Sequence, residues 1–161
     1  MRVRDLMTPD PWSCAPTDSL AAAARLLWDR DVGVLPVVEG GVVVGMLTDR
    51  DACMAAYTQG RPLAELPVRS AMSREVHAAR PDDSIASAMF TMREQQVRRL
   101  PVVDEAGGLQ GVLSVGDLTG AAVVGDLDPG ELIDTLAAIG RSRSDLRPLQ
   151  LVPVRVRHRS A

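Results

Sequence analysis

The pattern of apolar and polar positions repeats itself along the chain. In the first part, residues 34–38 and 42–47 are apolar runs bounded by turn residues, which indicates two short buried strands joined at Glu39-Gly40-Gly41. The spacing before them predicts an amphipathic helix capped by Asp18 or Ser19, with apolar residues at Leu20, Ala23, Ala24, Leu27 and Trp28. An extended segment over 12–15 precedes this helix, and an alanine-rich helix over 49–57 follows the strands. The same order of elements returns over residues 75–79, 84–96, 100–103, 109–113 and 115–124.

An internal repeat accounts for this pattern. The stretch Gly45-Met46-Leu47-Thr48-Asp49-Arg50-Asp51 returns as Gly111-Val112-Leu113-Ser114-Val115-Gly116-Asp117, each time between an apolar strand and a helix. We therefore expect a first repeat over residues 1–60, a second over 66–125, and a C-terminal helix and basic tail over 126–161. Each repeat reads strand, helix, strand, strand, helix, which predicts a mixed α/β (α+β) fold. Because each half leaves an apolar sheet face, we expect the two halves to cover each other.

The repeated Gly-x-x-Thr/Ser-x-x-Asp motif has two readings. A strand that ends at a helix N-terminus offers free amides and a favourable dipole to an anion, and a hydroxyl and a carboxylate there could hold a phosphate and a sugar. The same residues, Thr48 with Asp51 and Ser114 with Asp117, are also close to a capping box, which needs no ligand. The residues alone leave both readings open.

These motifs resemble those of the CBS-domain family, and the pair of repeats resembles a tandem CBS (Bateman) module. The likeness rests on Val3-Arg4-Asp5-Leu6-Met7-Thr8, the Pro-x-Asp-Ser helix starts, the apolar-Pro strands and the two Gly-x-x-Thr/Ser-x-x-Asp endings. The chain also resembles small stand-alone CBS proteins of the mycobacterial hypoxic-response type. This likeness rests on Asp31-Val32-Gly33-Val34-Leu35-Pro36 and Gln96-Val97-Arg98-Arg99-Leu100-Pro101. The resemblance implies a pseudo-symmetric pair of repeats and a homodimer.

The resemblance also implies a ligand, an adenosine-type nucleotide such as AMP, ADP or ATP held in clefts between the repeats. Asp51 and Asp117 would bind ribose hydroxyls, and Thr48 and Ser114 would contact the phosphate or the sugar. The apolar-Pro strands, with Val34, Pro36 and Pro101, would line the adenine slot. Arg98 and Arg99 could neutralise phosphate charge, and their counterparts Gly33 and Val34 carry none, so we expect unequal sites. His77, opposite Trp12 in the repeat, either lines a cleft or is structural.

The function expected is therefore non-catalytic: a regulatory module that binds an adenine nucleotide, needs no further cofactor, and is read by an unknown protein partner. The alternative is a structural or partner-binding CBS protein that retains no nucleotide site. Catalysis is disfavoured because the sequence has no metal-ligand spacing, nucleophile elbow or phosphate loop.

Composition and charge narrow the partners further. Aromatic residues make up 2 % of the chain and the net charge is −3, which argues against nucleic acid as a partner. The charge is uneven, because residues 1–140 sum to −8 and residues 141–161 to +5. No apolar run is long enough to span a membrane, so we expect a cytoplasmic protein with no membrane partner, in which Cys14 and Cys53 are reduced. Asp128-Pro129-Gly130-Glu131 predicts the start of the C-terminal helix.

Overall fold

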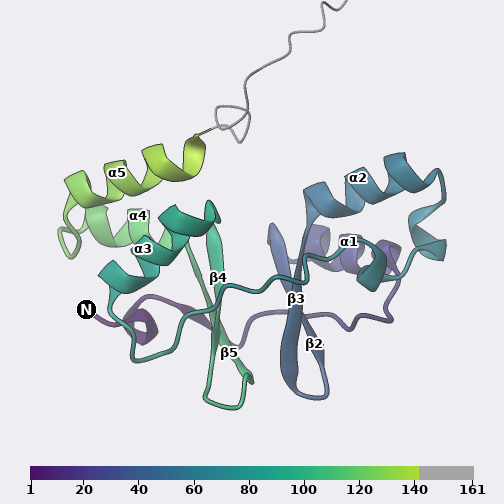
Figure 1. Ribbon diagram of the computed structural model, residues 1–161, viewed down its shortest axis with the longest axis horizontal. Coiled ribbons are helices and arrows are strands. Elements are labelled where there is room, and N and C mark those ends of the chain that lie inside the picture. The colour runs from purple at the N-terminus through teal and green to yellow at the C-terminus, as the bar shows by residue number, and fades with distance from the viewer. Residues whose placement is uncertain (142–161) are drawn as a thin grey trace, which may run out of the picture.

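The computed structural model describes residues 1–141, which form two α/β lobes side by side (Figure 1). The first lobe contains α1 (Leu20–Asp29), β2 (Val34–Glu39), β3 (Val42–Thr48) and α2 (Asp49–Gln59). The second contains α3 (Ile85–Gln95), β4 (Arg99–Val103), β5 (Leu109–Ser114) and α4 (Val115–Val123). The tandem arrangement and the mixed α/β class predicted from the repeat are thereby confirmed.

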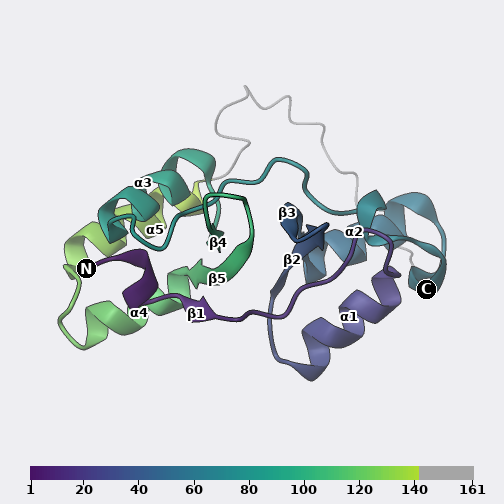
Figure 2. The same ribbon diagram turned by 90° about the horizontal axis from the view of Figure 1, so that it is seen from below.

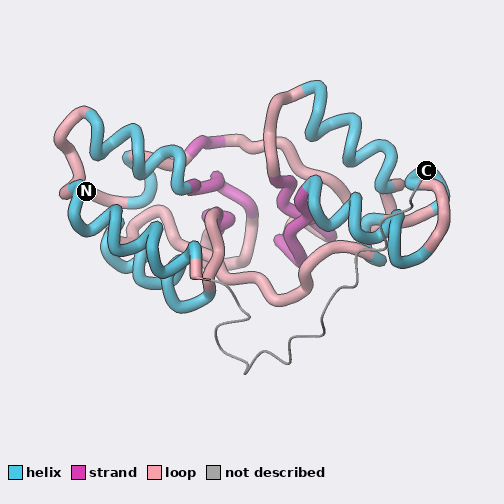
Figure 3. Tube along the Cα trace, turned by 90° about the horizontal axis from the view of Figure 1, so that it is seen from above, coloured by secondary structure: helices cyan, strands magenta, loops and turns pink. Residues whose placement is uncertain are grey.

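Each lobe is built on an antiparallel hairpin. Strand β2 pairs with β3 and β4 pairs with β5, and each hairpin has an irregularity at the same place, after Val37 in one and after Val102 in the other. The first turn uses Gly40 and Gly41 with φ of +58° and +83°, a conformation that suits glycine because it has no Cβ. Seen along the perpendicular direction, the strands of the two lobes face the middle of the molecule and the helices lie outside them (Figures 2 and 3).

Serine side chains begin the first helix of each lobe. The Ser19 hydroxyl accepts a hydrogen bond from the Ala22 amide, and the Ser84 hydroxyl accepts one from Ser87, both at 3.1 Å. Of the two residues predicted as caps, Ser19 is the N-cap, while the Asp18 carboxylate accepts from the Ala15 amide instead. Sequence spacing and local capping therefore agree on where these helices start.

The two lobes exchange the segments that precede their first helices. The N-terminal segment, with a 3₁₀ turn η1 (Val3–Asp5) and a short strand β1 (Thr8–Pro9), lies on the second lobe, where β1 pairs with β5. Val3 is fully buried in the core of that lobe. Conversely, Leu66 and Val68 are fully buried in the core of the first lobe, and Ser73 forms a bridge with Met46 of β3. The packed units therefore differ from the sequence repeats at their starts.

The extended segments predicted before α1 and α3 form less regular structure than expected. Each is reduced to a single parallel bridge, Cys14 with Val37 and Ala79 with Val102. Prolines explain this, because Pro11 and Pro16 flank the first segment and Pro81 ends the second, and proline has no amide hydrogen for a sheet ladder.

A further helix, α5 (Pro129–Gly140), covers the helices of the second lobe. Asp128 caps it through the amides of Gly130 and Glu131, as the sequence predicts. It packs against α3 and α4, with Leu132, Thr135 and Ile139 buried. The basic tail predicted after this helix lies, from residue 142 on, outside the described residues.

Candidate functional site

The two repeated motifs form matching capping boxes at the N-termini of α2 and α4. In the first, the Asp51 amide donates to the Thr48 hydroxyl (3.2 Å), and the Asp51 Oδ2 accepts from the Thr48 amide and hydroxyl (2.9 and 2.7 Å). Ser114 and Asp117 make the same three bonds at 3.3, 2.7 and 2.7 Å. The capping reading of the motif therefore holds in both repeats.

The capping boxes use only one oxygen of each carboxylate. Within residues 1–141, no hydrogen bond to the second oxygen, Oδ1, of either Asp51 or Asp117 is present. Both side chains are half-buried, so Oδ1 lies at a helix N-terminus that is partly shielded from water. A carboxylate oxygen in that position can still accept hydrogen bonds from a ligand, and the cap holds its orientation.

A cleft of about 480 Å³ lies between the two lobes in front of α4. Ser114, Asp117 and Val112 line it from the second lobe, and the run Arg30 to Val34 lines it from the first. The exchanged N-terminal segment closes it with residues 8–12, from Thr8 to Trp12. The structure thus brings together four of the predicted site residues, namely Val34, Arg99, Ser114 and Asp117.

Two arginines line this cleft. Arg99 reaches across from β4 to the first lobe, where its Nη2 lies only 3.0 Å from the position that a Cβ on Gly33 would take. The absence of a side chain at Gly33 therefore makes room for the guanidinium. Arg30 stacks on Trp12, with its Cζ 3.9 Å from the ring centroid. Both arginines lie among the residues that line the cleft, together with the carboxylates of Asp10, Asp31 and Asp117.

The other predicted site residues lie elsewhere. Thr48 and Asp51 form the equivalent helix start of the first lobe, and Arg98 is exposed at the position equivalent to Gly33. Pro36 and Pro101 are buried in their strands, where their carbonyls accept from the Cys14 and Ala79 amides. These residues, with His77, are not among those that line the cleft in front of α4. The His77 Nε2 lies 3.6 Å from a carboxylate oxygen of Glu75, an ion pair only when the imidazole is protonated.

Sequence reasoning missed the contribution of Trp12 and Arg30. Trp12 was placed opposite His77 in the repeat, and that equivalence was a usable signal for a position beside a cleft. Arg30 had no such signal, because its place depends on Asp31, which adopts a left-handed backbone conformation with φ of +50°.

Metal and membrane features are absent from the described part of the chain. Residues 1–141 contain no group of three or more His, Cys, Asp or Glu side chains placed to hold a metal ion. Nor does any helix of this region combine the length and apolar character that crossing a membrane requires.

Comparison with known proteins identifies the family. The model of the CBS domain matches residues 3–57 and again residues 68–124. The chain is 40 % identical over 116 residues to the CBS domain-containing protein YhcV of Bacillus subtilis (strain 168), covering 72 % of this chain and 81 % of that protein. Hypoxic Response Protein I, solved with two coordinated zinc ions, is 27 % identical with a TM-score of 0.68, covering 74 % of this chain and 98 % of that one.

CBSX2, solved in complex with AMP, is 29 % identical with a TM-score of 0.67, covering 76 % of this chain and 96 % of that one. The predicted resemblance to tandem CBS proteins, including the hypoxic-response type, is confirmed by these matches.

Proposed function

Because the chain belongs to the CBS-domain family, with two copies in tandem, we propose that it is a non-catalytic sensor that binds an adenosine-type nucleotide in the cleft in front of α4. The observation that carries this proposal is the cleft itself, which joins the capped start of α4 to Val34 and Arg99. The complex of the similar protein CBSX2 with AMP supports the class of ligand.

Different residues of the cleft contact different parts of the nucleotide. The Oδ1 atom of Asp117 accepts hydrogen bonds from the ribose hydroxyls, while Oδ2 remains in the cap. The N-terminus of α4 and the guanidinium of Arg99 receive phosphate. Val34 and Val112 offer the base an apolar surface, and Trp12 an aromatic one.

In this proposal the nucleotide sites of the two repeats differ in their positive charge. Arg99 belongs to the cleft of Asp117, whereas Thr48, Asp51, Arg98 and His77 would serve the equivalent site of the first repeat. We expect Arg99→Ala to weaken binding of ADP and ATP more than that of adenosine, because only the phosphorylated ligands need its charge.

The alternative function is a structural or partner-binding CBS protein without a nucleotide site. The complete capping boxes favour it, because they give Thr48, Asp51, Ser114 and Asp117 a purpose that needs no ligand. Binding has to be measured with a variant that leaves the caps intact.

Substitution of aspartate by asparagine meets this need. In Asp117→Asn the amide oxygen can keep the two cap bonds while an NH₂ group replaces Oδ1, so ribose loses its acceptor. AMP at one hundred times its dissociation constant stabilises the folded state by about 2.7 kcal/mol, which raises the unfolding midpoint by roughly 5–10 °C. We expect Asp117→Asn to abolish this shift and the exposed control Asp134→Asn to keep it.

Asp51→Asn tests the other repeat. If AMP still raises the unfolding midpoint of this variant, binding is assigned to the cleft of Asp117. If AMP, ADP and ATP all leave the midpoint of the wild-type protein unchanged, the structural alternative stands.

A homodimer and a protein partner are part of the same proposal. Large apolar side chains are exposed on the helices, among them Met54 and Tyr57 on α2, Phe90 on α3 and Ile133 on α5. Where such side chains form one contiguous patch, they are typical of a surface that binds another protein. Sedimentation of the full chain at micromolar concentration tests the dimer, and a monomer there would contradict it.

A further inference from the structure

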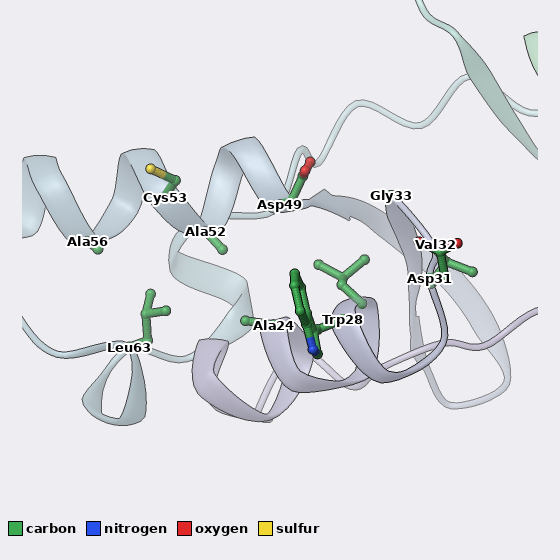
Figure 4. A pocket seen from close by; sticks show the side chains of 11 residues that line it. Ala24, Trp28, Asp31, Val32, Gly33, Asp49, Ala52, Cys53, Ala56 and Leu63 are labelled. Carbon is green, nitrogen blue, oxygen red and sulfur yellow. The ribbon is translucent and has the colours of Figure 1, made fainter.

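Arg99 crosses the cleft from one lobe to the other. Its backbone lies opposite Ser114, the N-cap of α4, in the ladder of β4 and β5. Its guanidinium ends on the first lobe, at Gly33, in the turn that joins α1 to β2 (Figure 4). This turn lines the cleft on one side and a hollow of about 560 Å³ between α1 and α2 on the other. One side chain therefore connects the start of α4 with the opposite wall of the cleft.

Gly33 leaves open the space that this guanidinium occupies. The three atoms nearest to the position of a Cβ on Gly33 all belong to Arg99, with Nη2 at 3.0 Å, Cζ at 3.5 Å and Nη1 at 3.7 Å. A methyl group there would push the guanidinium away by a few tenths of an ångström, and a larger side chain would push it further. The backbone itself does not require glycine, because Gly33 is not among the residues with positive φ. A substitution at this position therefore acts on the side chain of Arg99 and not on the turn.

The charge of Arg99 has no counter-ion within residues 1–141. The carboxylates of Asp10, Asp31 and Asp117 line the same cleft, yet none of them forms an ion pair with this guanidinium. Arg99 is half-buried, so part of its hydration is lost. A partly desolvated cation without a partner favours an anion beside it, and charge-assisted hydrogen bonds to phosphate are among the strong ones.

The other repeat carries the reverse arrangement. Arg98 stands at the position equivalent to Gly33, and Val34 stands at the position equivalent to Arg99. Val34 lies opposite Thr48, the N-cap of α2, so an apolar side chain replaces the arginine beside that helix start. The combination of a glycine on one lobe with an arginine reaching it from the other is therefore a feature of the cleft in front of α4.

We propose that Gly33 determines the preference of this cleft for phosphorylated ligands, because it positions the guanidinium of Arg99. This inference rests on the proposed function and adds to it a residue whose contribution is the space that it leaves. With the guanidinium packed on Gly33, the hydrogen bonds of Arg99 are aligned for the phosphate at the start of α4. A side chain at residue 33 keeps the charge in the cleft and disturbs that alignment, on which the strength of a hydrogen bond depends.

Isothermal titration calorimetry of the full chain with adenosine and with ADP, without added divalent cations, tests this proposal. The quantity compared between variants is the dissociation constant of adenosine divided by that of ADP. Gly33→Ala should lower this ratio by about threefold and Gly33→Val by about tenfold, since the larger side chain displaces the guanidinium further. The ratio cancels any effect of residue 33 on the part of the ligand that adenosine and ADP share.

A double-mutant cycle separates positioning of Arg99 from a general structural effect. Arg99→Ala alone should lower the ratio at least as much as Gly33→Val does. Adding Gly33→Val to Arg99→Ala should then change the ratio no further, because no guanidinium remains to be displaced. A further fall of the ratio in the double variant would show that residue 33 acts independently of Arg99, and would overturn the proposal.

Gly120→Ala is the matched control, because it adds the same methyl group where no atom lies within 4 Å, and it should keep the wild-type ratio. An unchanged ratio in Gly33→Ala and Gly33→Val, or equal affinity of the wild-type chain for adenosine and ADP, overturns this inference and leaves the proposed function standing. If the wild-type chain binds neither adenosine nor ADP, the proposed function fails, and this inference fails with it.

Discussion

At the scale of single residues, Asp117 combines a structural and a binding capacity in one side chain. Its Oδ2 completes the cap of α4, and the cap fixes the carboxylate at the wall of the cleft. The two readings of the repeated motif therefore do not exclude each other. A ligand that uses Oδ1 would bind to a group whose orientation has already been fixed by folding, which lowers the entropy cost of binding.

The glycine of the same motif gives a prediction about stability. A Cβ at Gly45 would lie 2.7 Å from the backbone carbonyl oxygen of Ser73, the residue that bridges to β3. Gly45→Ala should therefore push the exchanged segment away and lower the free energy of unfolding by about 1–3 kcal/mol.

Gly120→Ala is the matched control, measured by urea denaturation beside Gly45→Ala. Gly120 lies inside α4 with no atom within 4 Å of its Cβ position, so alanine should stabilise the helix by about 0.5–1 kcal/mol. Equal effects of the two substitutions would show that close approach of Ser73 is unimportant.

Part of the candidate site could be predicted from the sequence because it is local. Ser114 and Asp117 are three residues apart, a spacing that predicts the start of a helix. Val34 and Arg99 occupy equivalent positions in the two repeats. Trp12 and Arg30 enter the cleft through the exchanged N-terminal segment and the left-handed turn at Asp31. Contacts of that kind depend on how the two lobes assemble. The periodicity along one repeat carries no information about that assembly.

At the scale of elements, α5 distinguishes the second lobe from the first. Its buried stripe of Leu132, Thr135 and Ile139 follows helical spacing, while Ile133 is 62 % exposed. Leu132→Ala should lower the free energy of unfolding by about 2–3 kcal/mol, because it leaves a cavity against α3 and α4.

Ile133→Ala is its control on the same helix. This substitution removes a side chain of similar size from the exposed face and should change the stability by less than about 0.5 kcal/mol. Urea unfolding followed by circular dichroism measures both variants. A small effect of Leu132→Ala would mean that α5 contributes little to the fold of the second lobe.

At the scale of the whole molecule, the exchange of segments ties the two lobes together. The helices and hairpins of each repeat were predictable, because apolar periodicity, serine caps and glycine turns act over a few residues. That Val3 packs in the core of the second lobe, and Leu66 and Val68 in that of the first, was not predictable from these signals. Apolar patterning marks these residues for burial, but it does not say which of two similar sheets each one packs against.

This exchange predicts that the lobes unfold together. Both tryptophans, Trp12 and Trp28, lie beside the first lobe, whereas Val3 is fully buried in the core of the second. Val3→Ala should destabilise the protein by about 2 kcal/mol through lost burial and the cavity left behind. If the lobes form one cooperative unit, this loss appears undiminished in the tryptophan fluorescence transition, although the substitution lies in the other lobe.

Urea titration followed by tryptophan fluorescence and by far-UV circular dichroism measures this coupling. Val123→Ala, at a position that is 81 % exposed on α4, should leave both transitions in place. Coincident shifts of the two signals in Val3→Ala would show that unfolding of either lobe removes segments that the other needs. A fluorescence transition that stays at its wild-type midpoint while the circular dichroism becomes biphasic would show independent lobes. A ligand between the lobes could then change their relative position without affecting their folding, and the cleft would act as a hinge rather than as part of a single rigid body.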